Sequence, residues 1–171
     1  MAEKAEELAA KAYQLGWEYE KTYYGCGQCV TAALQDTLGL PNDALFKAIT
    51  GFGGGVGLAG DSGCGSYLGS VVILSSIVGR TRDNMRDAEG ARLKTYALAR
   101  KLHDRFIQEY GSVNCRDIIT KITGRYYYLP DAEEFGKYIR AGAHDVICPE
   151  VVGKAARWTV EILAEENLLP G

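Results

Sequence analysis

The sequence predicts an all-α protein, a single-domain helical bundle. A glycine-rich loop is expected before the helix that starts near Cys64. Apolar residues recur at three- and four-residue steps through most of the 171 residues, as on amphipathic helices. No segment has the pattern of a β-hairpin, and there is no internal repeat. The length suffices for one sizeable hydrophobic core, so we expect one helical domain over residues 1–171.

The expected helices follow from their periodicity and from the residues that begin and end them. In order, they cover residues 2–23, 26–39, 42–51, 64–79, 87–111, 114–124, the second part of 125–142, and 148–168. Asn42 or Asp43 is a favoured N-cap for the third, and Gly51 suits its end. Gly111 suits the end of the long fifth helix, which is expected to begin near Asp87.

The segment "GFGGGVGLAGDSGCG", residues 51–65, interrupts this helical pattern. Eight of its fifteen residues are glycine, which allows the backbone to approach a cofactor closely and to present N–H groups to it. Within it, "GVGLAG" matches the G-x-G-x-x-G pattern of dinucleotide sites. That pattern requires a preceding strand, and a short helix is expected here, so we reject nucleotide binding.

The composition excludes several classes of protein. A net charge of −3 gives no basic surface, so nucleic acid is not an expected partner. No apolar run is long enough to cross a bilayer, so no membrane insertion is expected, and the N-terminal segment is not expected to be a secretory signal. We therefore expect a cytoplasmic protein with reduced thiols, in which five cysteines indicate metal ligands or redox thiols rather than structural disulfides.

Four of the five cysteines fall at expected helix N-termini: Cys26, Cys64, Cys115 and Cys148. Cys29 lies one turn into the helix that Cys26 begins. Free backbone N–H groups and the positive end of the helix dipole favour an anion at such positions and lower the pKa of a thiol. Four such helix starts, if they converge, would surround four thiolates with backbone donors, a setting that suits an iron–sulfur cluster.

Three functions are compatible with these cysteines. The first is electron transfer or redox sensing by an iron–sulfur cluster on the four helix-start cysteines, which implies a redox partner protein. The second is thiol–disulfide exchange, with Cys26 as nucleophile and Cys29 as resolving thiol. The third is a structural zinc site of four thiolates, although zinc ligands usually come in close pairs and only one pair exists here. A homodimer is compatible with the amphipathic faces.

Four segments resemble the C-GCAxxG-C-C family. They are "GCGQCVTAALQDTLGL", "GFGGGVGLAGDSGCGSYLGSVVILSSIVGR", "GSVNCRDI" and "ICPEVVGKAARWTVEIL", and the resemblance covers about residues 25–163. It implies redox activity, and it implies that Cys26, Cys64, Cys115 and Cys148 are the cofactor-binding and metal-ligating residues of an iron–sulfur cluster of unknown type.

The chain departs from the family pattern at two positions. Ser66 replaces an alanine, and Cys29 replaces a small apolar residue, which leaves Cys29 as an accessory ligand, a disulfide partner of Cys26 or a packed thiol. A related domain in split-Soret cytochrome c accompanies haem, but no C-x-x-C-H motif is present here, so no haem is expected.

The two histidines and several tyrosines are not expected to take part in the site. His144 lies four residues before Cys148 but is expected on the solvated surface, as is His103. Tyr67 and residues 126–128 are expected to be ordinary packed aromatics rather than a shield over a cofactor.

Overall fold

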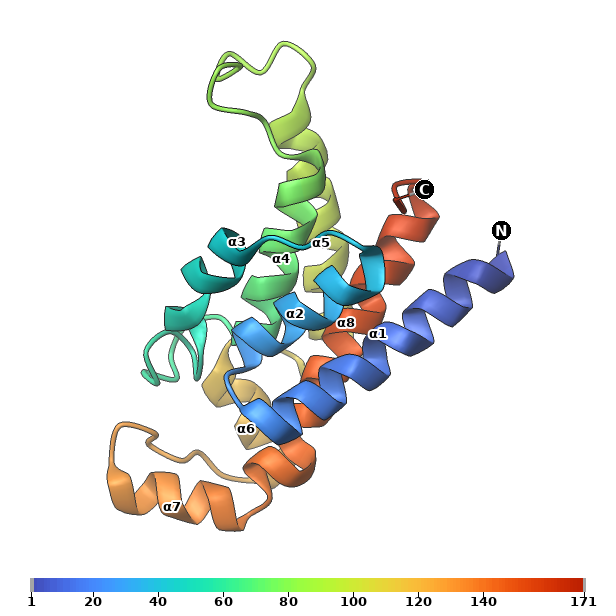
Figure 1. Ribbon diagram of the computed structural model, residues 1–171. Coiled ribbons are helices and arrows are strands. Elements are labelled where there is room, and N and C mark those ends of the chain that lie inside the picture. The colour runs from blue at the N-terminus through green and yellow to red at the C-terminus, as the bar shows by residue number, and fades with distance from the viewer. Residues whose placement is uncertain (1, 171) are drawn as a thin grey trace.

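The computed structural model describes residues 2–170 and confirms the all-α class (Figure 1). In that part of the chain there are eight α-helices and no strand, with one isolated bridge between Gly63 and Asn114. The helices are α1 (Ala2–Tyr23), α2 (Cys26–Leu38), α3 (Asp43–Ala48), α4 (Gly65–Val78), α5 (Ala91–Tyr110), α6 (Cys115–Thr123), α7 (Ala132–Arg140) and α8 (Cys148–Glu165). A 3-10 turn, η1 (Thr50–Phe52), follows α3, and a π-helical segment, η2 (Ala143–Ile147), precedes α8.

The core forms around α8, which packs against α1, α2, α4 and α5. The α1–α8 pair is the most extensive, and two glycines let these helices lie close together. A Cβ on Gly153 would be 2.9 Å from the Tyr13 ring, and one on Gly16 would be 3.1 Å from the Val152 carbonyl oxygen. The close crossing of α1 and α8 brings the C-terminal end of α1 to the start of α8.

A second, smaller apolar cluster lies where α6, α7 and η2 meet, at the end of the molecule away from the two chain termini. Its buried members include Ile119, Leu129, Tyr138 and Ile147, and it also includes Cys115. This lobe lies beside the starts of α2 and α8 (Figure 1).

The long helix α5 begins later than expected. It starts at Ala91, after Gly90 with φ +69°, rather than near Asp87. Asp87 itself adopts φ +59°, and its carboxylate accepts a hydrogen bond from the Arg92 N–H, so it caps the helix from outside. Residues 79–90, called the arm here, therefore form a loop that projects with the ends of α4 and α5 away from the other helices (Figure 1).

None of the helices described between residues 2 and 170 is both long and apolar enough to cross a membrane.

Candidate functional site

The four predicted cysteines line one cavity of about 200 Å³. Cys26 is the first residue of α2, Cys115 of α6 and Cys148 of α8, and Cys64 is the residue before α4. The structure therefore brings together four helix starts that are separated by 33 to 51 residues along the chain. Apolar side chains make up most of the remaining wall.

The glycine-rich loop forms a wall of this cavity, and two of its glycines leave no room for a side chain. A Cβ on Gly65 would lie 2.5 Å from Cys26 Sγ. At Gly55, where φ is +73°, a Cβ would lie 2.9 Å from the Cys115 Cβ and 2.8 Å from the Gly60 Cα. The backbone thus approaches the cysteines as closely as it can, which is the role that small residues have in a cofactor loop.

Backbone hydrogen bonds fix this loop to the start of α6 and change one expectation. The Cys64 N–H donates to the Val113 oxygen (2.8 Å), and the Cys115 N–H donates to the Ser62 oxygen (3.0 Å). The Cys148 N–H donates to the Ala143 oxygen, because η2 continues directly into α8. The expected backbone donors at these helix starts therefore do not include the N–H groups of these three cysteines.

The pKa values of Cys26, Cys115 and Cys148 are raised, contrary to the expected lowering. A hydrogen bond with the Cys64 thiol raises the pKa of Cys26 well above its ordinary value, and burial raises it further. A hydrogen bond from the Gly54 N–H acts in the opposite direction. Burial raises the pKa of Cys115 to about 12, with a smaller contribution from Cys26. Burial also raises the pKa of Cys148. Burial and neighbouring groups therefore favour the neutral form of these three thiols, and a bound metal cation would reverse the effect, since it deprotonates the thiols that ligate it.

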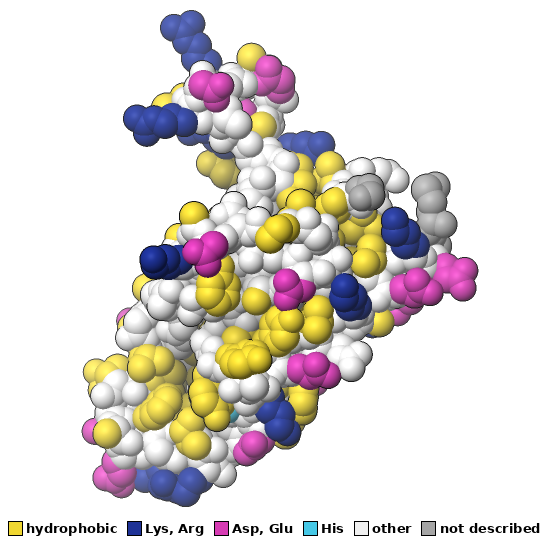
Figure 2. All heavy atoms as spheres, viewed as in Figure 1, with side chains coloured by type: hydrophobic (Ala, Val, Ile, Leu, Met, Phe, Trp, Pro, Cys, Tyr) yellow, Lys and Arg dark blue, Asp and Glu magenta, His cyan; other side chains and the backbone are white. Residues whose placement is uncertain are grey.

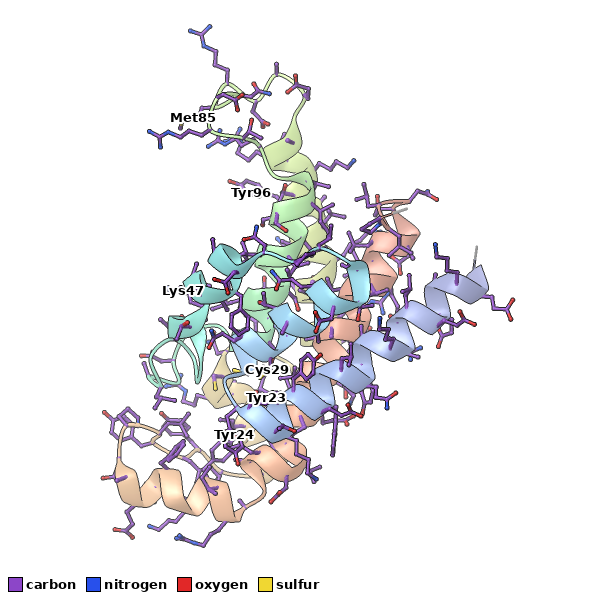
Figure 3. The ribbon with its side chains drawn as sticks, viewed as in Figure 1. Tyr23, Tyr24, Cys29, Lys47, Met85 and Tyr96 are labelled. Carbon is purple, nitrogen blue, oxygen red and sulfur yellow. The ribbon has the colours of Figure 1, made fainter. Side chains whose placement is uncertain are left out.

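Cys29 does not line the cavity of the other four cysteines. Its Sγ donates to the Tyr24 carbonyl oxygen at 3.0 Å, and it borders a separate surface hollow between α1, α2 and α3. Figure 3 shows Cys29 on α2, with Tyr24 at the junction of α1 and α2. All five cysteines are free thiols.

His144 is not a solvated surface residue, so that expectation is wrong. It lines the cavity, its Nδ1 lies 3.1 Å from Glu20 Oε1, and the Tyr24 ring packs against it with centroids 4.3 Å apart. The π-helical turns of η2 point this side chain toward α1, and no sequence signal predicts a π-helix here. His103, as expected, lies at the surface beside Asp104.

Sequence reasoning also missed Glu20 and Tyr138. Glu20 is 1% exposed and continues the buried stripe of Ala9, Ala12 and Gly16 along α1, so a carboxylate on the apolar face of a helix was the available signal. The Tyr138 hydroxyl lies 3.1 Å from Cys148 Sγ. The tyrosines considered from the sequence lie outside the cavity lining, and Tyr67 packs on Phe106 as an ordinary core aromatic.

The fold is therefore all-α, with four cysteine thiols from four helix starts around one cavity. The chain belongs to the family described as "Putative redox-active protein (C_GCAxxG_C_C)", whose model matches residues 24–162. This confirms the predicted family and agrees with a redox role. No curated protein and no solved structure matches the chain.

Proposed function

We propose that the protein holds one iron–sulfur cluster on Cys26, Cys64, Cys115 and Cys148, and that it serves in electron transfer or redox sensing with a partner protein. The observation that carries the proposal is that these four thiols, from four different helices, line one cavity. Thiolate sulfur is the ligand that iron–sulfur clusters take most often. When bound, such a cluster supplies a one-electron carrier inside the bundle.

The spacing of the sulfurs favours a cluster over a single zinc ion. In a tetrahedral site with Zn–S distances of about 2.3 Å, the sulfurs lie about 3.8 Å from one another. Among residues 2–170, the four cysteine sulfurs do not all lie within 4.8 Å of one another. The three side chains whose possible ligand atoms do lie that close together are Glu20, His144 and Cys148. They surround a space, as ligands of a multi-atom cluster do.

The cavity wall fits an anionic cluster in two further respects. Gly53 and Gly54 line the cavity and add no side chain that would fill it. Ser66, at the position where the family pattern has alanine, is fully buried and lines the cavity, and its Oγ has no hydrogen-bond partner among the described residues. A hydroxyl in that position can donate to a cluster sulfur, and such hydrogen bonds tune the reduction potential.

A Cys26–Cys29 dithiol has less support. The Cys29 thiol is directed to the Tyr24 carbonyl and a different hollow, whereas Cys26 interacts with Cys64. The two thiols of the C-x-x-C pair are therefore directed to different partners.

The proposal is tested by purification without oxygen, followed by visible absorption and assays of iron and acid-labile sulfide. We expect broad visible absorption and matching iron and sulfide for the wild-type protein. Cys115→Ser and Cys148→Ser should lose both, whereas the matched control Cys29→Ser should keep them. Full iron and sulfide in the first two variants, or a wild-type protein that takes up no iron in anaerobic reconstitution, would contradict the proposal.

A further inference from the structure

Three side chains of different chemistry meet at one side of the cysteine cavity. Glu20 comes from the last turns of α1, His144 from η2 and Cys148 from the first turn of α8. One carboxylate oxygen, one imidazole nitrogen and the thiol sulfur all lie within 4.8 Å of one another. The close crossing of α1 and α8, which depends on Gly16 and Gly153, sets this arrangement.

The Glu20 carboxylate is buried, and one of its two oxygens has no partner among the described residues. It is 1% exposed, and its Oε2 is buried with no hydrogen-bond partner among the described residues. The nearby Cys29 thiol already donates to the Tyr24 carbonyl oxygen. The cavity lining contains no lysine or arginine, and His144 is its one basic side chain. His144 thus contacts only one of the two carboxylate oxygens, and a buried charge is costly unless it is fully paired or coordinates a metal.

We propose that Glu20, His144 and Cys148 form a mononuclear site for a divalent metal ion of the zinc type, which shares only Cys148 with the four-cysteine site. Carboxylate oxygen, imidazole nitrogen and thiolate sulfur are the three ligand types that zinc takes in proteins. In a tetrahedral site with Zn–N and Zn–O distances of about 2.1 Å, these two atoms lie about 3.4 Å apart. The separation of 3.1 Å between His144 Nδ1 and Glu20 Oε1 is close to that value.

Neighbouring side chains hold the three ligands in place. The Tyr24 ring covers the imidazole, and the Tyr138 hydroxyl lies within hydrogen-bond distance of the Cys148 sulfur. Such outer contacts orient metal ligands and are part of a built site. Three protein ligands would leave one position of a tetrahedral ion for a further ligand, as in catalytic zinc sites.

The two sites share Cys148, so a divalent ion held here competes with a cluster held by the four cysteines. The metal site does not rest on the proposed function, because Glu20 and His144 are not among the four cluster ligands. Either site can therefore fail in experiment without the other.

Cobalt(II) binding to a protein that keeps only one cavity thiol tests the inference. In the triple variant Cys26→Ala, Cys64→Ala, Cys115→Ala, we expect one equivalent of Co²⁺ to bind with a thiolate-to-cobalt absorption band. Adding Glu20→Gln or His144→Ala should weaken binding at least tenfold. His103→Ala is the matched control, because His103 also pairs with a carboxylate, Asp104, at 3.0 Å but lies at the surface. Absence of Co²⁺ binding by the folded triple variant, or unchanged affinity after Glu20→Gln and His144→Ala, would overturn the proposal.

X-ray absorption of the zinc-loaded wild-type protein, with no cluster bound, tests the same ligands if the triple variant does not fold. We expect a mixed shell with nitrogen or oxygen at about 2.0–2.1 Å and sulfur at about 2.3 Å. A shell of sulfur alone would overturn the proposal. Loss of iron and sulfide in Cys115→Ser tests the cluster, whereas loss of Co²⁺ after Glu20→Gln or His144→Ala in the triple variant tests this metal site, so the two results are separate.

Discussion

The cysteine cavity and the arm are two loop-built regions with opposite character. At the cavity, the glycine-rich loop is bonded to the start of α6, and the backbone lies against cysteine side chains without space between them. In the arm, most side chains are exposed, and Figure 2 shows lysine or arginine side chains that project from this end of the molecule. Both regions contain glycines with positive φ, but a Cβ would meet other atoms only at some of those in the glycine-rich loop, such as Gly55 and Gly60.

This difference shows that a glycine can be required for its backbone conformation alone or also for the space that a side chain would fill. Gly55 and Gly90 have nearly the same backbone conformation, with φ +73° and +69°. Gly90 ends the arm with nothing within 4 Å of a would-be Cβ, so its glycine is needed for conformation alone. Gly55 is needed for conformation and for space, because the loop and Cys115 must lie together at the cavity.

We expect the largest difference in the free energy of unfolding when these two glycines are replaced by alanine. Gly90→Ala should lower the free energy of unfolding by about 1–2 kcal/mol, the cost of a left-handed conformation in a residue with a Cβ. Gly55→Ala should cost about 1–3 kcal/mol more, because the new methyl group overlaps Gly60 and Cys115. Chemical denaturation of both variants measures this difference, and equal losses would show that the cavity wall yields without cost.

Alkaline pH should weaken the cavity before it affects the arm. Burial raises the pKa of the Cys115 thiol from 9.0 to about 12, so the folded protein keeps a proton that the unfolded chain releases. With metal removed by a chelator, the stability that this thiol contributes is full below pH 9 and is lost as the pH rises toward 12.

Denaturation at several pH values checks this prediction. The fall in stability above pH 9 should be less steep in Cys115→Ala, which retains Cys26 and Cys148 with their raised pKa values. An identical slope in that variant would rule out Cys115 as a source of the pH dependence.

The smallest effect is expected in the arm itself. Met85 is 61% exposed, so Met85→Ala should change the free energy of unfolding by less than about 0.5 kcal/mol. Iron and sulfide contents should equal those of the wild-type protein. A clear loss of stability or of iron in this variant would mean that the arm is coupled to the cavity.

The sequence was sufficient for the fold class, for most helices and for the cysteines at helix starts. Each of these depends on local patterns: periodicity, N-cap residues and glycine at helix ends. The late start of α5 was missed because Asp87 and Gly90 act through positive φ values that a helical pattern does not reveal. Glu20 and His144 were missed for another reason: they lie 124 residues apart, and their contact depends on η2 and on the crossing of α1 and α8.

The thiol pKa values show a further limit of sequence reasoning. A helix N-terminus predicts a lowered pKa, but burial and neighbouring thiols reverse it at Cys26 and Cys115. Burial depends on the whole fold, whereas the helix start can be recognised from a few residues.

The most direct test of the four-cysteine centre is a crystal structure of protein purified without oxygen, with anomalous diffraction measured at the iron edge. We predict one anomalous peak inside the cavity, within bonding distance of Cys26, Cys64, Cys115 and Cys148, and none beside Cys29. Iron located elsewhere in iron-loaded crystals, with the four thiols unligated, would contradict the account.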